Sequence, residues 1–268
     1  MTTTTFIDHD IQEVSNAQKA RILRDALPYI REYYGKVVVV KYGGNAMVNE
    51  ELRKAVLADI VLLHLIGVKV VLVHGGGPHI KEALNQVGLE SKFLNGLRVT
   101  DEATMKIVQM VLAGQVNKDL VNLLGALGGK AIGLCGIDDA MIQVQKQSDE
   151  LGLVGEITHI NPELIHDSLA NGYIPVISSI GTDGKGVSYN INADTAAAEI
   201  AGALQAECMI SLTNIDGVLR NPDDPSTLFH SLTMQDVQQL TDEGIIAGGM
   251  IPKVKCCTDA IDCGVKRV

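Results

Sequence analysis

Two lysines in this sequence each stand beside a pair of glycines, an arrangement suited to binding an anion. Lys41 follows a strand-like run of four valines and is itself followed, one residue later, by Gly43 and Gly44. Lys253 follows a second glycine pair, at the expected start of a helix. A loop without side chains lets a ligand approach backbone N–H groups, and phosphate is favoured at a helix N-terminus, where a lysine opposes the dipole by roughly 0.3–1 kcal/mol. The two segments therefore predict a site for a phosphoryl group.

A group of amide and carboxylate side chains in the second half offers a partner for these lysines. Asn190, Asn192 and Asp194 lie where a strand is expected to pass into a helix. Helix capping explains one such residue, either Asn192 or Asp194, and this interpretation stays open for the group. If Asp194 instead holds the two ammonium groups in place, Lys41 and Lys253 form a clamp for the charge that spreads over a transferring phosphoryl group.

The usual signatures of several other enzyme classes are missing from the sequence. It contains no G-x-x-x-x-G-K-[ST] or G-x-G-x-x-G phosphate loop, no H-E-x-x-H metal motif, no nucleophile elbow and no protein-kinase pair of H-R-D and D-F-G. Apolar strands also commonly end in a lysine that extends into solvent, so Lys41 alone does not establish a site. The site has to be built from several segments.

The glycines after Lys41 belong to a predicted unit of strand, helix and strand. The strand at 36–41 precedes a helix at 50–65, and a second buried strand at 69–73 runs into His74-Gly75-Gly76-Gly77-Pro78. Such a unit makes the two strands parallel, with a right-handed connection. Both glycine loops then lie at the carboxyl edge of one sheet, where open α/β sheets bind ligands.

The remaining pattern predicts an α/β chain without tandem repeats. Asn95-Gly96 predicts a hairpin, and Pro28 should kink or divide the first helix. Residues 141–160 indicate short strands, and 178–186 a loop of glycine and serine. The other expected helices cover 12–34, 78–87, 102–113, 115–127, 162–170, 194–204, 234–240 and a stretch from 251, and the other strands cover 131–135, 174–178, 187–191 and 208–212.

Composition limits the classes of partner and the compartment. The chain has 268 residues, 46% of them hydrophobic, and a net charge of −10, which argues against nucleic acid or a membrane as partner because both need a basic surface. No apolar run reaches the length of a membrane span and no leader is recognisable, so a cytoplasmic protein is expected. The five cysteines should be reduced, and Cys256, Cys257 and Cys263 are expected to pack in a helix rather than bind metal.

Together, the motifs resemble those of the N-acetyl-L-glutamate kinase (acetylglutamate kinase) family, arginine-sensitive type, within the amino acid kinase superfamily. The resemblance covers residues from about 15 to the end. It rests on the order and spacing of Lys41-Tyr-Gly43-Gly44-Asn-Ala, His74-Gly75-Gly76-Gly77-Pro78, Gly96-Leu-Arg98-Val-Thr100, Asn190-Ile-Asn192-Ala-Asp194, Leu212-Thr-Asn-Ile-Asp-Gly217-Val218 and Gly248-Gly-Met-Ile-Pro-Lys253. It implies an α/β fold, a three-layer α-β-α sandwich on a mainly parallel open sheet.

The resemblance also implies an activity and a role for particular residues. The family phosphorylates the side-chain carboxylate of N-acetyl-L-glutamate with ATP and Mg²⁺, in arginine biosynthesis. The implied catalytic residues are Lys41, Lys253 and Asp194. The implied contacts to the acyl amino acid are Gly76, Gly77, Arg98 and Asn190, and those to the nucleotide and its phosphates are Gly43, Gly44, Ser211, Thr213 and Gly217.

A division of labour along the chain follows from the same resemblance. It implies an amphipathic oligomerisation helix at 1–35, an acyl amino acid lobe at 36–180 and a nucleotide lobe at 181–268. Members with such a helix form dimers or hexamers and are inhibited by arginine, and relatives in phototrophs bind a PII protein. The family continues past Val268, so a C-terminal piece is expected to be missing, which leaves arginine binding open.

Two other interpretations remain open from the sequence. One is a different carboxylate or carbamate kinase of the same superfamily, which would not need Arg98 for its substrate. The other is a non-catalytic arginine-sensing or scaffold protein that retains the fold, for which Lys253 would be dispensable.

Overall fold

The computed structural model describes residues 14–47, 49–213, 215 and 217–268, and its centre is a five-stranded sheet. The strand order is β11-β1-β2-β8-β5, and every neighbouring pair is parallel. The strands are β1 (Val37–Tyr42), β2 (Lys69–His74), β5 (Ala131–Cys135), β8 (Ile174–Ser178) and β11 (Cys208–Ser211). The predicted α/β fold with a mainly parallel sheet is confirmed.

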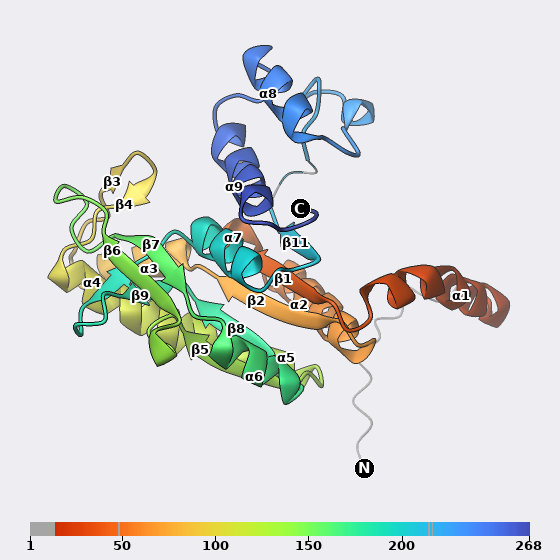
Figure 1. Cartoon of the computed structure of the whole chain (residues 1–268), viewed down its shortest axis with the longest axis horizontal. Coiled ribbons are helices and arrows are strands. Elements are labelled where there is room, and N and C mark those ends of the chain that lie inside the picture. Colours follow the sequence, from red (N-terminus) through yellow and green to blue (C-terminus); the bar gives the residue numbers. More distant parts are fainter. Residues whose placement is uncertain (1–13, 48, 214, 216) are drawn as a thin grey trace.

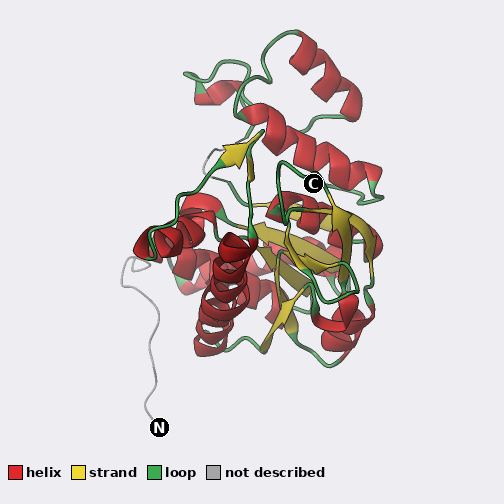
Figure 2. Cartoon of the chain, turned by 90° about the vertical axis from the view of Figure 1, so that its left-hand side faces the viewer, coloured by secondary structure: helices red, strands yellow, loops and turns green. Residues whose placement is uncertain are grey.

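Helices cover both faces of this sheet because its strands are apolar on both sides. In β1, Val38 and Val40 pack into one buried cluster and Val39 into another. The first cluster contains side chains of α2 (Glu50–Leu65), α3 (Gly77–Gln86), α4 (Glu102–Gln109) and α5 (Asn117–Ala126). The second contains side chains of α6 (Glu163–Ala170), α7 (Ala193–Ala203) and α9 (Met250–Asp262). Figure 1 shows α7 in front of β1 and β2 with α2 behind them, and in Figure 2 helices flank the yellow strands.

A second sheet of four strands packs over the α7 side of the core. Its order is β10-β9-β6-β7, with β6 (Ile142–Lys146), β7 (Gly155–Ile160), β9 (Ile180–Thr182) and β10 (Ser188–Asn190). The short strands expected within 141–160 are confirmed. The expectation that 178–186 is entirely loop is wrong, because residues 180–182 pair with β10. The sequence signal there is weak because Gly181 needs space: a methyl group on it would lie 2.5 Å from Val144 Cγ1.

The helical region from 102 to 126 is continuous, whereas two separate helices were expected. Between α4 and α5 the chain forms a π-helix, η3 (Met110–Val116). Gly114 suggested a break, but Val111, Leu112 and Val116 are buried, and this tertiary packing outweighs the low helix propensity of one glycine. Inserted π turns are frequent at functional sites.

The hairpin predicted at Asn95-Gly96 is confirmed. Strands β3 (Phe93–Leu94) and β4 (Leu97–Arg98) pair antiparallel. Asn95 and Gly96 have positive φ angles of 50° and 81°, which the tight hairpin turn requires.

The first helix, α1 (Asn16–Tyr33), projects from the sheet, as Figure 1 shows. Ser15 and Gln18 form a capping box at its start, and residues 12 and 13 of the predicted helix lie outside the described residues. The helix continues through Pro28 and is not divided there, and the expected kink stays a prediction. No α1 residue is buried, and a carbonyl freed by a proline in an exposed helix can bond to water.

The chain after β11 forms the part that stands above the sheet in Figure 1. It contains η5 (Pro225–Thr227), α8 (Met234–Asp242) and α9, with a small core of Leu240, Ile246 and Val254. The predicted lobes at 36–180 and 181–268 stay a prediction; β11, from the second, completes the sheet begun by β1, from the first. In the described part of the chain, no helix combines the length and apolarity needed to span a bilayer.

Candidate active site

The parallel register brings the two glycine loops to one edge of the sheet. Lys41 pairs with Val73 on one side and Ser211 on the other, and Tyr42 pairs with His74. The loops after β1 and β2 are joined directly, because the Gly75 N–H donates to the Tyr42 carbonyl at 3.2 Å. The two glycine loops therefore lie together at one edge of the sheet, as predicted.

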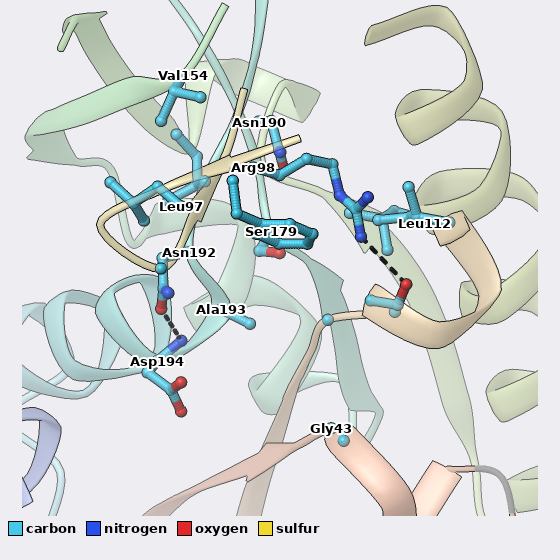
Figure 3. Close-up of a pocket in the computed structure, with 18 of the residues that line it drawn as sticks. Gly43, Leu97, Arg98, Leu112, Val154, Ser179, Asn190, Asn192, Ala193 and Asp194 are labelled. Carbon is cyan, nitrogen blue, oxygen red and sulfur yellow. Dashed lines mark hydrogen bonds between the residues drawn. The ribbon is translucent and has the colours of Figure 1, made fainter. Parts of the chain in front are cut away.

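A cavity of about 250 Å³ opens at this edge, as shown in Figure 3. It brings together eight of the predicted site residues from both halves of the chain: Lys41, Gly43, Gly44, Gly76, Gly77, Arg98, Asn190 and Asp194. The hairpin β3–β4 and the starts of α3 and α7 supply most of its wall. Segments from Lys41 to Asp194, far apart in the sequence, thus meet around one space.

Lys41 reaches this space because of its position in β1. Strand side chains alternate between faces, so Lys41 lies on the same face as Val39, toward α7. Its Nζ lies 2.7 Å from Asp194 Oδ1, and the two side chains are 13% and 42% exposed. A largely buried ammonium group is thereby held by a carboxylate that remains open to solvent.

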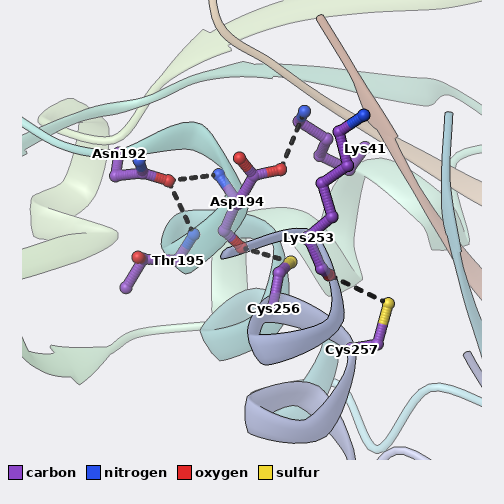
Figure 4. Close-up of polar contacts among 7 residues, drawn as sticks. All are labelled: Lys41, Asn192, Asp194, Thr195, Lys253, Cys256 and Cys257. Carbon is purple, nitrogen blue, oxygen red and sulfur yellow. Dashed lines mark hydrogen bonds and ion pairs between the residues drawn. The ribbon is translucent and has the colours of Figure 1, made fainter. Parts of the chain in front are cut away.

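The structure decides which side chain caps α7. Asn192 Oδ1 accepts hydrogen bonds from the N–H groups of Asp194 and Thr195, at 2.8 and 3.2 Å. The Asp194 carboxylate is not needed as the cap and instead faces Lys41, as Figure 4 shows. Of the two interpretations left open by the sequence, capping applies to Asn192 and cation positioning to Asp194.

Lys253 lies in the first turn of α9, close to the start of α7. The Cys256 thiol donates to the Asp194 carbonyl at 3.6 Å, which ties the two helix ends together. In Figure 4 the Lys253 side chain extends past Asp194, and its amino group ends near that of Lys41. The two lysines and the carboxylate are therefore neighbours, although Lys253 does not line the cavity itself.

The cysteines of α9 are packing residues in this arrangement. Burial, with a contribution from Asp194, raises the pKa of Cys256 to about 12, and burial also raises the pKa of Cys257. Neutral thiols are poor metal ligands and poor nucleophiles. Within the described ranges, no cluster of three or more histidine, cysteine or acidic side chains is arranged to hold a metal ion.

The start of α3 adds backbone donors to the same wall. Gly76 is the N-cap, and no side chain caps this helix. The first N–H groups of a helix have no partner within it, and with the dipole they form an anion site. The cavity thus presents lysine charge from β1 and neutral N–H groups from α3.

Arg98 stands in the wall formed by the hairpin. Its guanidinium donates to Ser91 Oγ and, at 3.2 Å, to the Gly77 carbonyl, and it stacks 4.8 Å from the Phe93 ring centroid. Burial lowers the pKa of Arg98 from its usual value, but a guanidinium stays charged near neutral pH. A fixed cation here suits a carboxylate bound bidentately.

Asn190 is held beside Arg98 by a short chain of polar contacts. Its Nδ2 donates to Thr100 Oγ1 at 3.2 Å, and Thr100 Oγ1 donates to the Arg98 carbonyl at 2.7 Å. The first half of the chain thereby orients an amide of the second half at the cavity.

Three predicted nucleotide contacts lie outside this cavity. Ser211 is the last residue of β11, beside Lys41, and Thr213 and Gly217 follow it toward the part that stands above the sheet. Gly217 has a φ of +150°, and a methyl group on it would lie 2.9 Å from Leu228 Cδ1. Ser211 is thus next to Lys41 in the sheet, Thr213 and Gly217 follow it in the chain, and the role of all three stays a prediction.

Sequence reasoning missed several side chains that shape the cavity. Phe93, Leu97, Leu112, Val154 and Ser179 line it. The hairpin motif gave a signal for Phe93 and Leu97. Leu112 had no signal, because the π-helix that presents it follows from packing rather than from a local pattern.

The geometry suits a substrate with two anionic groups. Arg98, beside Gly77, and Asn190 form one group among its lining residues, and Lys41 and Asp194 form another. A carboxylate at Arg98 would leave a second anionic group beside Lys41. Because positive charge and N–H donors already point there, developing phosphoryl charge would be stabilised without reorganisation.

Several known proteins are similar to this chain in sequence or in structure. The model of the amino acid kinase family matches residues 36–268. A protein of Clostridium kluyveri named acetylglutamate kinase is 55% identical over 92% of this chain and 88% of its own length. One of Brachyspira hyodysenteriae with the same name is 51% identical over 96% of this chain and 90% of its own. The crystal structure of smu.665 from Streptococcus mutans superposes with a TM-score of 0.74 at 33% identity, over 85% of this chain and 91% of that one.

Proposed function

The chain belongs to the amino acid kinase family, and from that premise we propose that it transfers the γ-phosphoryl group of ATP to the side-chain carboxylate of N-acetyl-L-glutamate. The observation that carries the proposal is a single cavity with the Lys41–Asp194 ion pair on one side and buried Arg98 on the other. The product is an acyl phosphate, N-acetyl-L-glutamyl 5-phosphate.

The residues of the cavity divide between binding and transfer in this proposal. Arg98 pairs with the α-carboxylate, and Asn190 holds the acetamido group. The side-chain carboxylate then attacks the γ-phosphorus, in line with the leaving ADP oxygen. Lys41 and Lys253 stabilise the charge on the transferring group, and Asp194 keeps the Lys41 ammonium group in position.

The nucleotide is assigned to the side of Ser211, Thr213 and Gly217. Gly43 and Gly44 bind its phosphates, while Gly76 and Gly77 face the acyl amino acid. Mg²⁺ would neutralise phosphate charge, and nucleotide phosphates supply most of its ligands in such enzymes. The only carboxylate lining the cavity among the described residues is Asp194, which Lys41 already engages, so we assign no dedicated protein site to the metal.

Trapping the product tests the activity. The protein is incubated with ATP, Mg²⁺, N-acetyl-L-glutamate and hydroxylamine, which converts an acyl phosphate into a coloured hydroxamate. The proposal expects hydroxamate with N-acetyl-L-glutamate and little with glutamate, aspartate or carbamate. Equal yields with these acceptors, or none with N-acetyl-L-glutamate, would contradict it.

Arg98→Ala separates this substrate from others of the superfamily. The change should raise KM for N-acetyl-L-glutamate by about 10- to 100-fold, because a buried charged hydrogen-bond partner is lost. The KM for ATP should hardly change. A loss of kcat without a change in KM would assign Arg98 to another task.

Lys253→Ala separates a kinase from a scaffold that retains the fold. The kinase proposal expects kcat to fall by at least about 100-fold with folding preserved. Lys255→Ala is the matched control, because Lys255 lies on the same helix, is 68% exposed and forms an ion pair with Asp259 at 2.8 Å. Unaltered behaviour of Lys253→Ala would favour the scaffold.

Regulation and assembly belong to the proposal as predictions from sequence. The exposed apolar residues Ile22 and Leu23 of α1, at 61% and 70%, support a dimer or hexamer formed through that helix. Arginine is the expected inhibitor, a PII protein is expected as partner only if the source is a phototroph, and the cytoplasm is the expected compartment. Sedimentation with and without residues 1–35, and activity against arginine concentration, test these points.

A further inference from the structure

A buried histidine and a buried asparagine contact each other beneath the glycine loop that follows β2. His74, at the end of β2, is 0% exposed, and Asn117, at the start of α5, is 1% exposed. The His74 Nε2 and the Asn117 Nδ2 are 3.0 Å apart, and the His74 Nδ1 is 3.0 Å from the Gly75 carbonyl oxygen. Neither side chain lines the cavity, so the substrate contacts described above leave this pair unexplained.

The pair permits one arrangement of protons. The Gly75 carbonyl oxygen can only accept, so the ring proton is on His74 Nδ1, and Nε2 is left as the acceptor that faces Asn117 Nδ2. Burial, together with the charges of His79 and Lys118, lowers the pKa of His74 to about 4, which keeps the ring neutral. Asn117 Nδ2 carries two hydrogens and lies within hydrogen-bond distance of three acceptors, His74 Nε2 and the carbonyls of Leu134 and Val176, the carbonyls at 3.2 and 2.8 Å, which holds the amide in place.

Fixing the Gly75 carbonyl also fixes the next N–H. No described peptide bond is cis, and in a trans peptide the carbonyl oxygen and the following N–H point to opposite sides. Because the Gly75 oxygen turns inward to His74, the Gly76 N–H turns outward, and Gly75, Gly76 and Gly77 all line the cavity. Among the residues that the structure describes, none accepts a backbone hydrogen bond from the Gly76 N–H.

The π-helix places the second half of this arrangement. Its residues Leu112 and Val116 lie against Gly76, since a methyl group there would be 2.6 Å from Leu112 Cδ2 and 3.4 Å from Val116 Cγ2. Asn117 follows at once and meets His74. Lys118 Nζ donates to Asn117 Oδ1 at 3.1 Å, which polarises the amide and strengthens its donor end.

We propose that His74 and Asn117 are positioning residues that aim the Gly76 N–H into the cavity as a donor to the acyl amino acid and the phosphoryl group it receives. A chain of hydrogen bonds runs from Lys118 through Asn117 and His74 to the Gly75–Gly76 peptide. The π-helix η3 places Leu112 and Val116 against Gly76, and it places the residue that follows it, Asn117, against His74. This assignment rests on the proposed kinase function.

The kinetic test compares two substitutions of His74. His74→Leu removes the bond to Gly75 and should lower kcat/KM for N-acetyl-L-glutamate by about 10- to 100-fold, with KM for ATP within about twofold. His74→Asn, whose amide reaches the place of Nδ1, should restore most of the loss. The control is Ile165→Val, a buried change in α6 that should lower Tm without changing the ratio of the two KM values. Equal kinetics for His74→Leu and Ile165→Val at similar Tm would overturn the proposal.

A spectroscopic test stands apart from turnover. In wild-type protein labelled with ¹⁵N-histidine, the His74 resonances, identified by their loss in His74→Asn, should report the tautomer protonated at Nδ1. In protein labelled with ¹⁵N-glycine, the Gly76 amide signal should shift on addition of N-acetyl-L-glutamate and should move more in His74→Leu than in Ile165→Val. A tautomer protonated at Nε2, or a Gly76 amide signal that does not change in His74→Leu, would overturn the proposal that His74 and Asn117 position this N–H. An absence of hydroxamate with wild-type protein, beside the expected spectra, refutes the kinase function alone.

Discussion

The two glycine loops of the cavity look alike in sequence and differ in why they contain glycine. Gly44, after β1, has a φ of +68°, and a methyl group added there would meet no atom within 4 Å. Gly76, after β2, has an extended φ of −179°, but a methyl group there would lie 2.6 Å from Leu112. The first loop needs glycine for its backbone conformation, and the second needs it for space.

The loops also differ in the electrostatics they bring to the cavity. The loop after β1 is accompanied by the charge of Lys41, paired with Asp194 at 2.7 Å. The loop after β2 carries no charge of its own and depends on neutral His74 to orient its N–H. We infer that the first loop supplies charge and the second supplies direction, and the following substitutions test that difference.

Removing the charge of the first loop should have the largest effect. Lys41→Met should lower kcat by at least about 100-fold, because a preorganised cation is lost from the transferring group. Thermal unfolding should change little, since Asp194 is 42% exposed and can be solvated. Lys69→Met, an exposed lysine at the other end of β2, is the control for a general charge effect. A similar kcat for the two variants would break the assignment of charge to the first loop.

The neutral state of His74, which precedes the second loop, should be detectable in the dependence of stability on acid pH. The pKa of His74 is lowered to about 4 in the folded protein, and an unfolded histidine titrates near 6.5. Between pH 4 and pH 6.5 the unfolded chain binds more protons than the folded protein. The contribution of neutral His74 to the free energy of unfolding is therefore fully present above pH 6.5, and it is lost as the pH falls toward 4, by roughly 3 kcal/mol in all. Urea unfolding across this range should show a shallower decline for His74→Leu than for wild type, and parallel declines would contradict a neutral, buried ring.

Steric crowding at the second loop predicts a smaller, local cost. Gly76→Ala should lower stability by about 1–3 kcal/mol and reduce activity, because Leu112 has to move. Gly77→Ala is the matched control, since a methyl group there meets no atom within 4 Å. Adding Leu112→Ala to Gly76→Ala should recover part of the activity. If Gly76→Ala and Gly77→Ala unfold at the same temperature, space is not the reason for glycine at 76.

The backbone requirement of the first loop predicts the smallest effect. Gly44→Ala should cost about 1–2 kcal/mol through its left-handed conformation, and Gly44→Asn less. Gly43→Ala should be nearly neutral, because its methyl group would only touch Lys41 Nζ at an ordinary 3.5 Å. Equal stability of Gly44→Ala and Gly43→Ala in urea would remove the conformational half of the comparison.

Local signals predicted most of the individual elements. The four valines of β1 and the apolar run of β2 indicate buried strands by both residue type and apolar pattern, and both strands lie where expected. The place of β8 between β2 and β5 was not predictable in this way, because it depends on pairing between segments far apart in the sequence. The π-helix was missed for a related reason: the packing of Leu112 and Val116 outweighs the helix-breaking tendency of Gly114.

The candidate site divides along the same line. The motifs predicted that Lys41, Arg98, Asn190 and Asp194 would share a site, and they line one cavity. They did not decide which residue caps α7, because Asn and Asp are about equally good helix N-caps, and only the structure shows Asp194 paired with Lys41. Asn117 gave no signal, since its partner His74 lies 43 residues away and an asparagine within a helical pattern is ordinary.

A structure with a non-hydrolysable ATP analogue, Mg²⁺ and N-acetyl-L-glutamate tests most directly whether both loops act on one phosphoryl group. The quantities to measure are the distances from Lys41 Nζ, Lys253 Nζ and the Gly44 and Gly76 nitrogens to the oxygens around the γ-phosphorus. We expect the lysines and both backbone nitrogens at hydrogen-bond distance, about 3 Å, from these oxygens, with the α-carboxylate on Arg98. An acyl amino acid bound away from Arg98, or lysine nitrogens beyond about 4 Å from those oxygens, would contradict it.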